Sequence, residues 1–170
     1  MSSRSFYSVY NTDGTVRWSA QVSDLTGIAA GTAFDFLGDG KAEAMYADEH
    51  SMFAFGETGQ VVMQLPRTSA TLIEYPVVVD VDNDGSAEVV VVSNAIFRSE
   101  PSSPTVQVVR DKQDRWIAAR RIWNQHTYHV TNVREDGTIP QFEKKSWERL
   151  NTFRTNAQIG AGGVCQPPIE

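Results

Sequence analysis

The chain has 170 residues and a formal net charge of −6, from 15 basic and 21 acidic side chains. This length fits one ordinary domain, and a content of 41% hydrophobic and 21% charged residues excludes a disordered tail. The acidic balance argues against sequence-independent nucleic-acid binding, and no apolar run approaches the roughly 18–20 residues of a membrane span.

The two halves of the chain differ in charge. Residues 1–109 hold 5 basic and 14 acidic side chains, whereas residues 110–170 hold 10 basic and 7 acidic ones. Clustered carboxylates in the first half suggest a bound cation, whereas the basic second half is typical of a solvated face. No apolar signal segment follows Met1, so we expect either a cytosolic protein or an excised piece of a longer secreted one. Cys165 is the only cysteine, and it is either an idle thiol or the partner of a cysteine outside this sequence.

An internal repeat with a period of 45 residues organises the chain. Gly31–Ala47 matches Pro76–Val92, and Phe6–Val16 matches Ser51–Val61 at the same offset. Periods of about 40–50 residues indicate propeller blades or helical arrays. The repeated segments are short, rich in Val, Phe, Tyr and Thr, and closed by Gly turns, which favours strands.

In chain order, the predicted strands fall into a half unit and two complete units of four. They are Phe6–Tyr10 and Val16–Val22; then Thr32–Phe36, Ala42–Ala47, Ser51–Phe55 and Val61–Leu65; then Val77–Asp80, Ala87–Ser93, Thr105–Arg110 and Trp116–Arg121. The link 94–104 in the last unit predicts a surface loop, because Ser and Pro are frequent in it.

These elements predict an all-β fold, a partial β-propeller of about two and a half four-stranded antiparallel blades with a C-terminal cap. The blades span residues 5–122, as a half blade (5–23) and two blades (29–66 and 75–122). The closing segment, 123–158, predicts a strand at Trp123–Val133, a turn at 135–138 and a short helix or irregular cap at 146–153. Residues 159–170 predict a linker or tail.

The strongest chemical motif is the loop that begins at Asp80. Its carboxylates, Asp80, Asp82, Asp84 and Glu88, stand at loop positions 1, 3, 5 and 9, with Gly85 at position 6. Calcium prefers 6–8 oxygen ligands, and a Gly permits the sharp bend that turns the next carbonyl, of Ser86, inward. The loop therefore predicts a calcium site, in place of a solvated acidic turn. An EF-hand is excluded because its position 12 would be Val91.

The loop at Asp35 is a weaker copy of the same motif. Asp35, Asp39 and Glu43 keep positions 1, 5 and 9, and the carbonyl of Lys41 holds position 7. Position 3 is Leu37, which cannot bind a cation. Either a water fills the gap at lower affinity, or the loop keeps its shape without metal.

The Asp-x-Asp-x-Asp-Gly-x-x-Glu loop between short strands resembles the FG-GAP/VCBS repeats of integrin-like β-propellers, over about residues 5–122. The stretch 121–133 is similar to the closing segment of bacterial FG-GAP surface proteins. The resemblance implies an extracellular, calcium-stabilised propeller used for adhesion or carbohydrate contact. Such propellers usually have about six to eight blades, so either further blades or several copies of the chain would complete the ring.

Residues near the end of the repeat offer a second candidate site. Trp123, Gln125 and Tyr128 combine aromatic rings with an amide, as a sugar-binding patch does, but packing at the end of the last sheet is the favoured explanation. His126 and His129 would point to opposite faces of a strand, which argues against a shared metal.

Three functional classes remain open from the sequence. The first is a noncatalytic extracellular or cell-surface binding and adhesion module with structural calcium and a protein or glycan ligand. The second is a lectin-like propeller that binds sugar near Trp123. The third is a fragment of a polysaccharide-active enzyme, which is disfavoured because no nucleophile–base pair is visible and the paired carboxylates lie in the metal loops.

Overall fold

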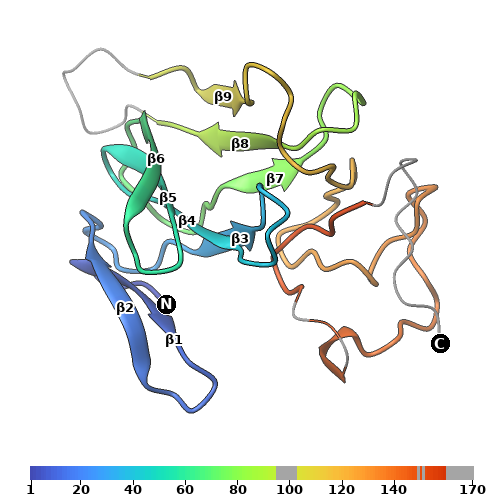
Figure 1. Cartoon of the computed structure of the whole chain (residues 1–170), viewed down its shortest axis with the longest axis horizontal. Coiled ribbons are helices and arrows are strands. Elements are labelled where there is room, and N and C mark those ends of the chain that lie inside the picture. The colour runs from blue at the N-terminus through green and yellow to red at the C-terminus, as the bar shows by residue number, and fades with distance from the viewer. Residues whose placement is uncertain (95–102, 149, 151, 160–170) are drawn as a thin grey trace. The chain divides into compact units, whose positions relative to one another are not determined.

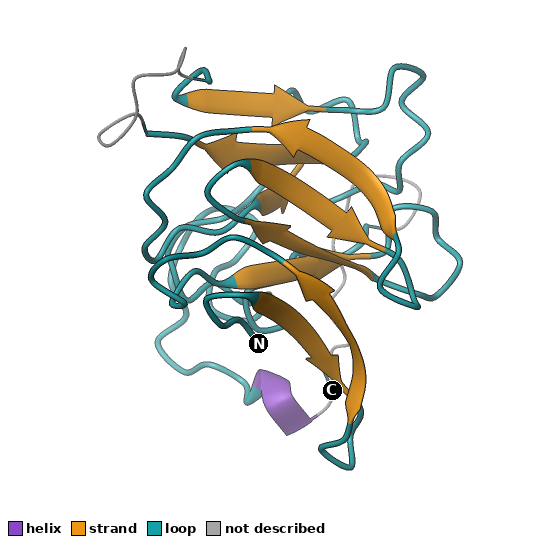
Figure 2. Cartoon of the chain, turned by 90° about the vertical axis from the view of Figure 1, so that its left-hand side faces the viewer, coloured by secondary structure: helices purple, strands orange, loops and turns teal. Residues whose placement is uncertain are grey.

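The computed structural model describes residues 1–94, 103–148, 150 and 152–159. Within these residues the fold is all-β, with three small antiparallel sheets and one short 3-10 helix, Ser146–Glu148 (Figure 2). The chain divides into two compact units, one of residues 1–33, 41–76 and 90–108 and one of residues 34–40, 77–89 and 109 onward. No helix in the described part of the chain is long and apolar enough to cross a membrane.

In the described part of the chain, nine strands make up the three sheets (Figure 1). They are β1 (Phe6–Tyr10) and β2 (Val16–Gln21); β3 (Gly31–Phe34), β4 (Glu43–Ala47), β5 (Ser51–Phe55) and β6 (Val61–Pro66); and β7 (Val77–Val79), β8 (Glu88–Val92) and β9 (Val106–Val109). In each sheet, neighbouring strands are consecutive in the chain. This order is that of simple meanders, as the short Gly-containing links predict.

The 45-residue repeat recurs in the backbone geometry. The bounds of β1 and β2 become those of β5 and β6 when 45 is added to each residue number. Both hairpins carry a register shift at the same place, between Val9 and Tyr10 and between Ala54 and Phe55. Each hairpin turn also contains a Gly at positive φ, Gly14 in the first and Gly59 in the second. In both, the Gly N–H donates to the carbonyl three residues earlier, at 3.0 Å. The repeat predicted from sequence is therefore confirmed as a structural repeat.

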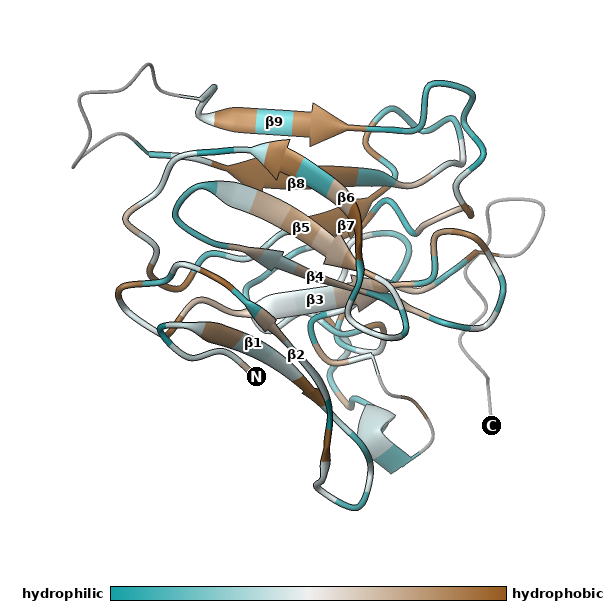
Figure 3. Ribbon diagram, turned by 60° about the vertical axis from the view of Figure 1, so that its left-hand side comes forward, coloured by the Kyte–Doolittle hydropathy of each residue, from teal (hydrophilic) through white to brown (hydrophobic). Residues whose placement is uncertain are grey.

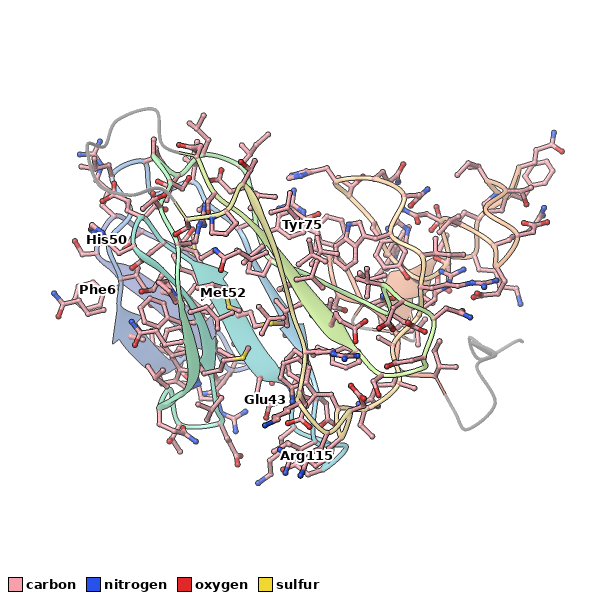
Figure 4. The ribbon with its side chains drawn as sticks, turned by 90° about the horizontal axis from the view of Figure 1, so that it is seen from above. Phe6, Glu43, His50, Met52, Tyr75 and Arg115 are labelled. Carbon is pink, nitrogen blue, oxygen red and sulfur yellow. The ribbon has the colours of Figure 1, made fainter. Side chains whose placement is uncertain are left out.

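The core of the first unit is largely aromatic. Tyr7 of β1 stacks on Tyr46 of β4, with ring centroids 4.7 Å apart, and Trp18 lies 5.5 Å from Phe55. Inward positions alternate with exposed ones along β2 and β6, as period 2 requires. Met52 of β5 is fully buried whereas Phe6 is half exposed (Figure 4), and β7 and β8 are hydrophobic over most of their length (Figure 3).

The prediction of a strand at Trp116–Arg121 is wrong. Among the residues that the structure describes, no strand follows β9 in its sheet, and the segment makes other partners instead. The Ile117 N–H donates to the Phe36 carbonyl at 2.9 Å, and the Trp116 ring lies 4.6 Å from the Phe36 ring. An isolated antiparallel bridge then joins Ala119 to Gln158. The segment leaves the β9 sheet because these partners bury its apolar side chains elsewhere.

The strand predicted at Trp123–Val133 is also wrong, because this stretch folds into irregular turns around the buried guanidinium of Arg120. Arg120, 2% exposed, donates to the carbonyls of Val130 and Val133 and to the Tyr128 hydroxyl, and it pairs with Glu135 at 2.6 Å. The turn predicted at 135–138 is present, and the cap at 146–153 contains one 3-10 turn. The tail from residue 160, Cys165 included, and most of the loop 94–104 lie outside the described residues.

Candidate metal site

The Asp80 loop follows β7 and is curled by its own first carboxylate. Asp80 Oδ1 accepts the Asn83 N–H at 2.6 Å, and Oδ2 accepts the Gly85 N–H at 3.1 Å. Asn83 and Gly85 both have positive φ, 64° and 98°, a conformation that Gly adopts freely and Asn tolerates. The sequence thus supplies the two residue types that this tight curl needs.

Three carboxylates of the loop converge. Oxygen atoms of Asp80, Asp82 and Glu88 all lie within 4.8 Å of one another, and they are the only such acidic group of three in the described part of the chain. Asp80 and Glu88 are buried, with 8% and 1% of their surface exposed. Glu88 stands at the start of β8, so the strand fixes its direction.

The Glu88 carboxylate carries an unused, buried oxygen. Its Oε2 accepts the Val81 N–H at 2.8 Å, but Oε1 is buried without any hydrogen-bond partner. Burial raises the pKa of Glu88, the hydrogen bond from Val81 opposes this, and the negative charges of Asp82, Asp84 and Asp80 raise the pKa further. Buried polar atoms in native proteins nearly always have a partner. A cation among these oxygens would supply one and remove the repulsion.

The donor set suits a hard cation. All three groups offer carboxylate oxygen, and calcium takes oxygen ligands at 2.3–2.6 Å. The converging group does not include Asp84 or Ser86, which were also predicted as ligands. Asp84 Oδ1 accepts the Ser86 N–H at 2.8 Å. The Ser86 hydroxyl donates to the Asp114 carbonyl at 3.1 Å. Their roles as ligands stay predictions.

The Asp35 loop has the same curl without the converging carboxylates. Asp35 accepts the N–H groups of Gly38 at 2.7 Å and Gly40 at 2.8 Å, at positions 45 residues before Asn83 and Gly85. Leu37 is 69% exposed at the third position. Of the other predicted ligands, Asp39 is exposed. Lys41 and Glu43 belong to the first unit. The Lys41 side chain pairs with Glu57 at 2.6 Å. Metal binding by this loop stays a prediction.

The predicted sugar patch is only partly accessible. Tyr128 is fully buried, and its hydroxyl donates to Asn156 Oδ1 at 2.8 Å, so its ring is not available to a ligand. Trp123 is partly exposed and stacks on Tyr128 at 4.6 Å, and Gln125 is exposed. His126 contacts Arg154, and His129 contacts Glu143.

Two arginines that the sequence analysis did not connect with the site approach the Asp80 loop. Arg110 Nη1 lies 3.4 Å from Asp82 Oδ2 and 3.7 Å from Asp84 Oδ2, and Arg121 donates to Asn83 Oδ1 at 3.3 Å. In the sequence, the only indication that basic side chains could approach this acidic loop was the basic character of residues 110–170. Nothing in the local sequence, however, pairs Arg110 with a loop 28 residues earlier.

Comparison with known proteins gave one informative match. No protein-family model and no curated protein matches the chain, so the resemblance to FG-GAP/VCBS repeats is not confirmed. Among solved structures, the crystal structure of the Vibrio cholerae biofilm matrix protein Bap1 is similar, with a TM-score of 0.83 and 31% sequence identity. The match covers 92% of this chain and 27% of the Bap1 chain, so this chain spans about a quarter of that protein.

Proposed function

We propose that the chain is part of a noncatalytic extracellular binding and adhesion module whose Asp80 loop binds structural calcium. The observation that carries the calcium assignment is the buried Oε1 atom of Glu88, which has no partner in a cluster of three carboxylates. The extracellular and adhesive role is supported by similarity to a biofilm matrix protein. Three meander sheets with a 45-residue repeat are what propeller blades would supply, and we propose that arrangement for the complete protein.

The calcium in this proposal acts on stability. Asp80, Asp82 and Glu88 would hold the ion, and its charge would offset the repulsion that raises the pKa of Glu88. Because the unfolded chain lacks the curled loop, calcium binds the folded state preferentially and shifts the equilibrium toward it. Extracellular calcium modules commonly have dissociation constants of about 10⁻⁴–10⁻³ M, a range matched to external calcium.

An adhesion assay tests the functional part of the proposal. Fluorescently labelled chain is added to a preformed bacterial biofilm, which is then washed in calcium or in chelator. We expect retention of the wild-type chain in calcium and its loss in chelator, and a much smaller difference between the two buffers for Glu88→Gln. Equal retention of both chains in both buffers would contradict a calcium-dependent adhesive role, and turnover of a polysaccharide substrate would contradict the noncatalytic assignment.

A carbohydrate ligand is the second candidate, and the Trp123 ring favours it. This ring is partly exposed and is backed by buried Tyr128 at 4.6 Å, and a fixed aromatic plane beside exposed Gln125 is a suitable platform for a sugar face. A glycan array in calcium, run on wild type and Trp123→Ala, tests it. Sugar binding that Trp123→Ala abolishes while the thermal unfolding midpoint is kept would support this candidate, whereas equal array profiles would exclude it.

A further inference from the structure

We propose that the Arg110 guanidinium is a built-in substitute cation that competes with calcium for the Asp80 loop and thereby lowers its calcium affinity. This inference rests on the proposed calcium site and assigns it a residue that sets affinity. Arg110 comes directly after β9 and lies in the same compact unit as the loop. The Arg110 side chain adds no oxygen ligand, so its effect on a metal is one of charge alone.

The geometry places one nitrogen among three carboxylates. Arg110 Nη1 lies 3.4 Å from Asp82 Oδ2, 3.7 Å from Asp84 Oδ2 and 3.5 Å from Asp114 Oδ1. Asp82 is also one of the three residues whose oxygens converge on the candidate site. The guanidinium therefore neutralises a carboxylate that calcium would use.

The backbone positions Arg110 for this role. The turn after β9 repeats the hairpin turns at Gly14 and Gly59: the Asp114 N–H donates to the Asp111 carbonyl at 3.1 Å, and Asp114 has a φ of 51°. The Asp114 carbonyl accepts from Ser86 Oγ, which joins this turn to the metal loop. Both the strand that ends at Val109 and the turn that follows thus hold the Arg110 backbone beside the loop.

The consequence for affinity has a definite sign. In the metal-free chain the guanidinium lowers the repulsion among the loop carboxylates, which stabilises the empty loop. Once calcium is bound, the same positive charge repels the ion. Since an Arg side chain keeps its charge at every physiological pH, both effects raise the calcium dissociation constant. Because Arg110 is about half exposed, solvent screening limits the change to about three- to tenfold.

The test compares two substitutions that remove the same charge from the same turn. Arg110→Gln removes the guanidinium from the metal loop. Arg115→Gln is the matched control, because Arg115 (labelled in Figure 4) pairs bidentately with Asp111, at 2.9 and 2.6 Å. Titration calorimetry with calcium chloride is run on wild type and both variants. We expect Arg110→Gln to bind calcium about three- to tenfold more tightly, Arg115→Gln within about twofold of wild type, and Arg110→Lys, which keeps the charge, close to wild type.

A measurement on the wild-type chain covers the case in which Arg110→Gln does not fold. The side-chain ¹⁵N–¹H signal of Arg110 should shift as calcium is added, whereas that of Arg115 stays in place. No calcium binding by the wild-type chain would overturn the proposed function itself. Calcium binding that Arg110→Gln leaves unchanged or weakens, or an Arg110 signal that calcium does not move, would overturn only the role of Arg110.

Discussion

At the scale of single residues, Glu88 has the least satisfied environment among the loop carboxylates. It is 1% exposed, and one of its oxygens has no hydrogen-bond partner. Burial raises its pKa, and the negative charges of three neighbouring carboxylates raise the pKa further. Such an arrangement is costly in the absence of a cation, because a buried charge needs a partner. We infer that the Glu88 carboxylate is suited to binding a cation.

Glu88→Gln should therefore have opposite effects with and without calcium. The amide removes one negative charge and supplies donors to the neighbouring carboxylates, so we expect a higher thermal unfolding midpoint than wild type in chelator. It also removes a ligand, so we expect a smaller rise in the midpoint on adding calcium. Thermal unfolding in both buffers measures the two effects. A lower midpoint in chelator, combined with a normal calcium response, would refute this role of Glu88.

Asp24 is the contrasting case of a buried carboxylate that is fully bonded. Burial by itself would raise its pKa, but hydrogen bonds from Thr71, Tyr46 and Thr26 outweigh it and lower the pKa to about 2. The Thr71 hydroxyl donates to Oδ1 at 2.5 Å and the Tyr46 hydroxyl to Oδ2 at 2.6 Å. Since the unfolded pKa is about 3.9, the ionised group stabilises the fold fully above that pH and loses its effect as pH falls toward 2.

We predict that Asp24→Asn lowers the free energy of unfolding by about 2 kcal/mol at pH 7, the equivalent of the lowered pKa. The difference from wild type should shrink as pH falls below about 4. Urea unfolding at a series of pH values measures it, with Asp13→Asn as an exposed control. A difference that stays constant from pH 7 to pH 2 would mean that ionisation of Asp24 does not stabilise the fold.

At the scale of elements, the two repeated loops separate shape from metal binding. Both are curled by the first Asp through N–H groups at the same relative positions. Only the Asp80 loop brings three carboxylates together. The curl is thus a property of the Asp-to-Gly spacing. We propose that ion binding depends on the third position, which is Asp82 in one loop and Leu37 in the other.

Leu37→Asp should turn the second loop into a calcium site or strengthen one already there. Leu37 is 69% exposed, so the substitution buries no charge and leaves no cavity. We expect an added or tighter calcium-binding event in titration calorimetry, with Leu72→Asp, exposed elsewhere in the chain, as the control for net charge. An isotherm identical to that of the control would show that the third position does not limit this loop.

The irregular segment after β9 depends on Arg120. Its guanidinium bonds two backbone carbonyls, a hydroxyl and Glu135 from a buried position. Arg120→Ala leaves the carbonyls of the buried residues Val130 and Val133 without this donor, and we expect a loss of about 2–5 kcal/mol in unfolding free energy. Arg121→Ala, exposed next to it, should change stability by less than about 0.5 kcal/mol in chelator. Chemical unfolding measures both, and similar losses in the two variants would contradict the role of Arg120.

The strands differ in how far the sequence predicts them. β1 to β9 follow from the 45-residue repeat and from apolar segments closed by Gly turns, which are local signals. Trp116–Arg121 has a similar apolar pattern but pairs with Phe36 and Gln158, partners that lie far away in sequence. The curl of the Asp80 loop and its central carboxylates were predictable from spacing. The position of Arg110 was not, because it depends on how β9 ends beside the loop.

At the scale of the whole molecule, the uneven charge of the sequence has a structural counterpart. Basic side chains of the second half, Arg110 and Arg121, lie against the acidic loop of the first half. The chain spans 27% of the biofilm matrix protein whose structure it resembles. A ligand and a propeller arrangement are therefore proposals, whereas the three converging carboxylates lie within one compact unit of this chain.

The most direct test of the account is calorimetric unfolding of the wild-type chain in chelator and in calcium at a hundredfold excess over its dissociation constant, with Glu88→Gln alongside. The account predicts that calcium stabilises the wild-type fold by about 2.7 kcal/mol and stabilises Glu88→Gln by much less. An unfolding midpoint of the wild-type chain that is the same in both buffers would contradict the central claim that the Asp80 loop is a calcium site.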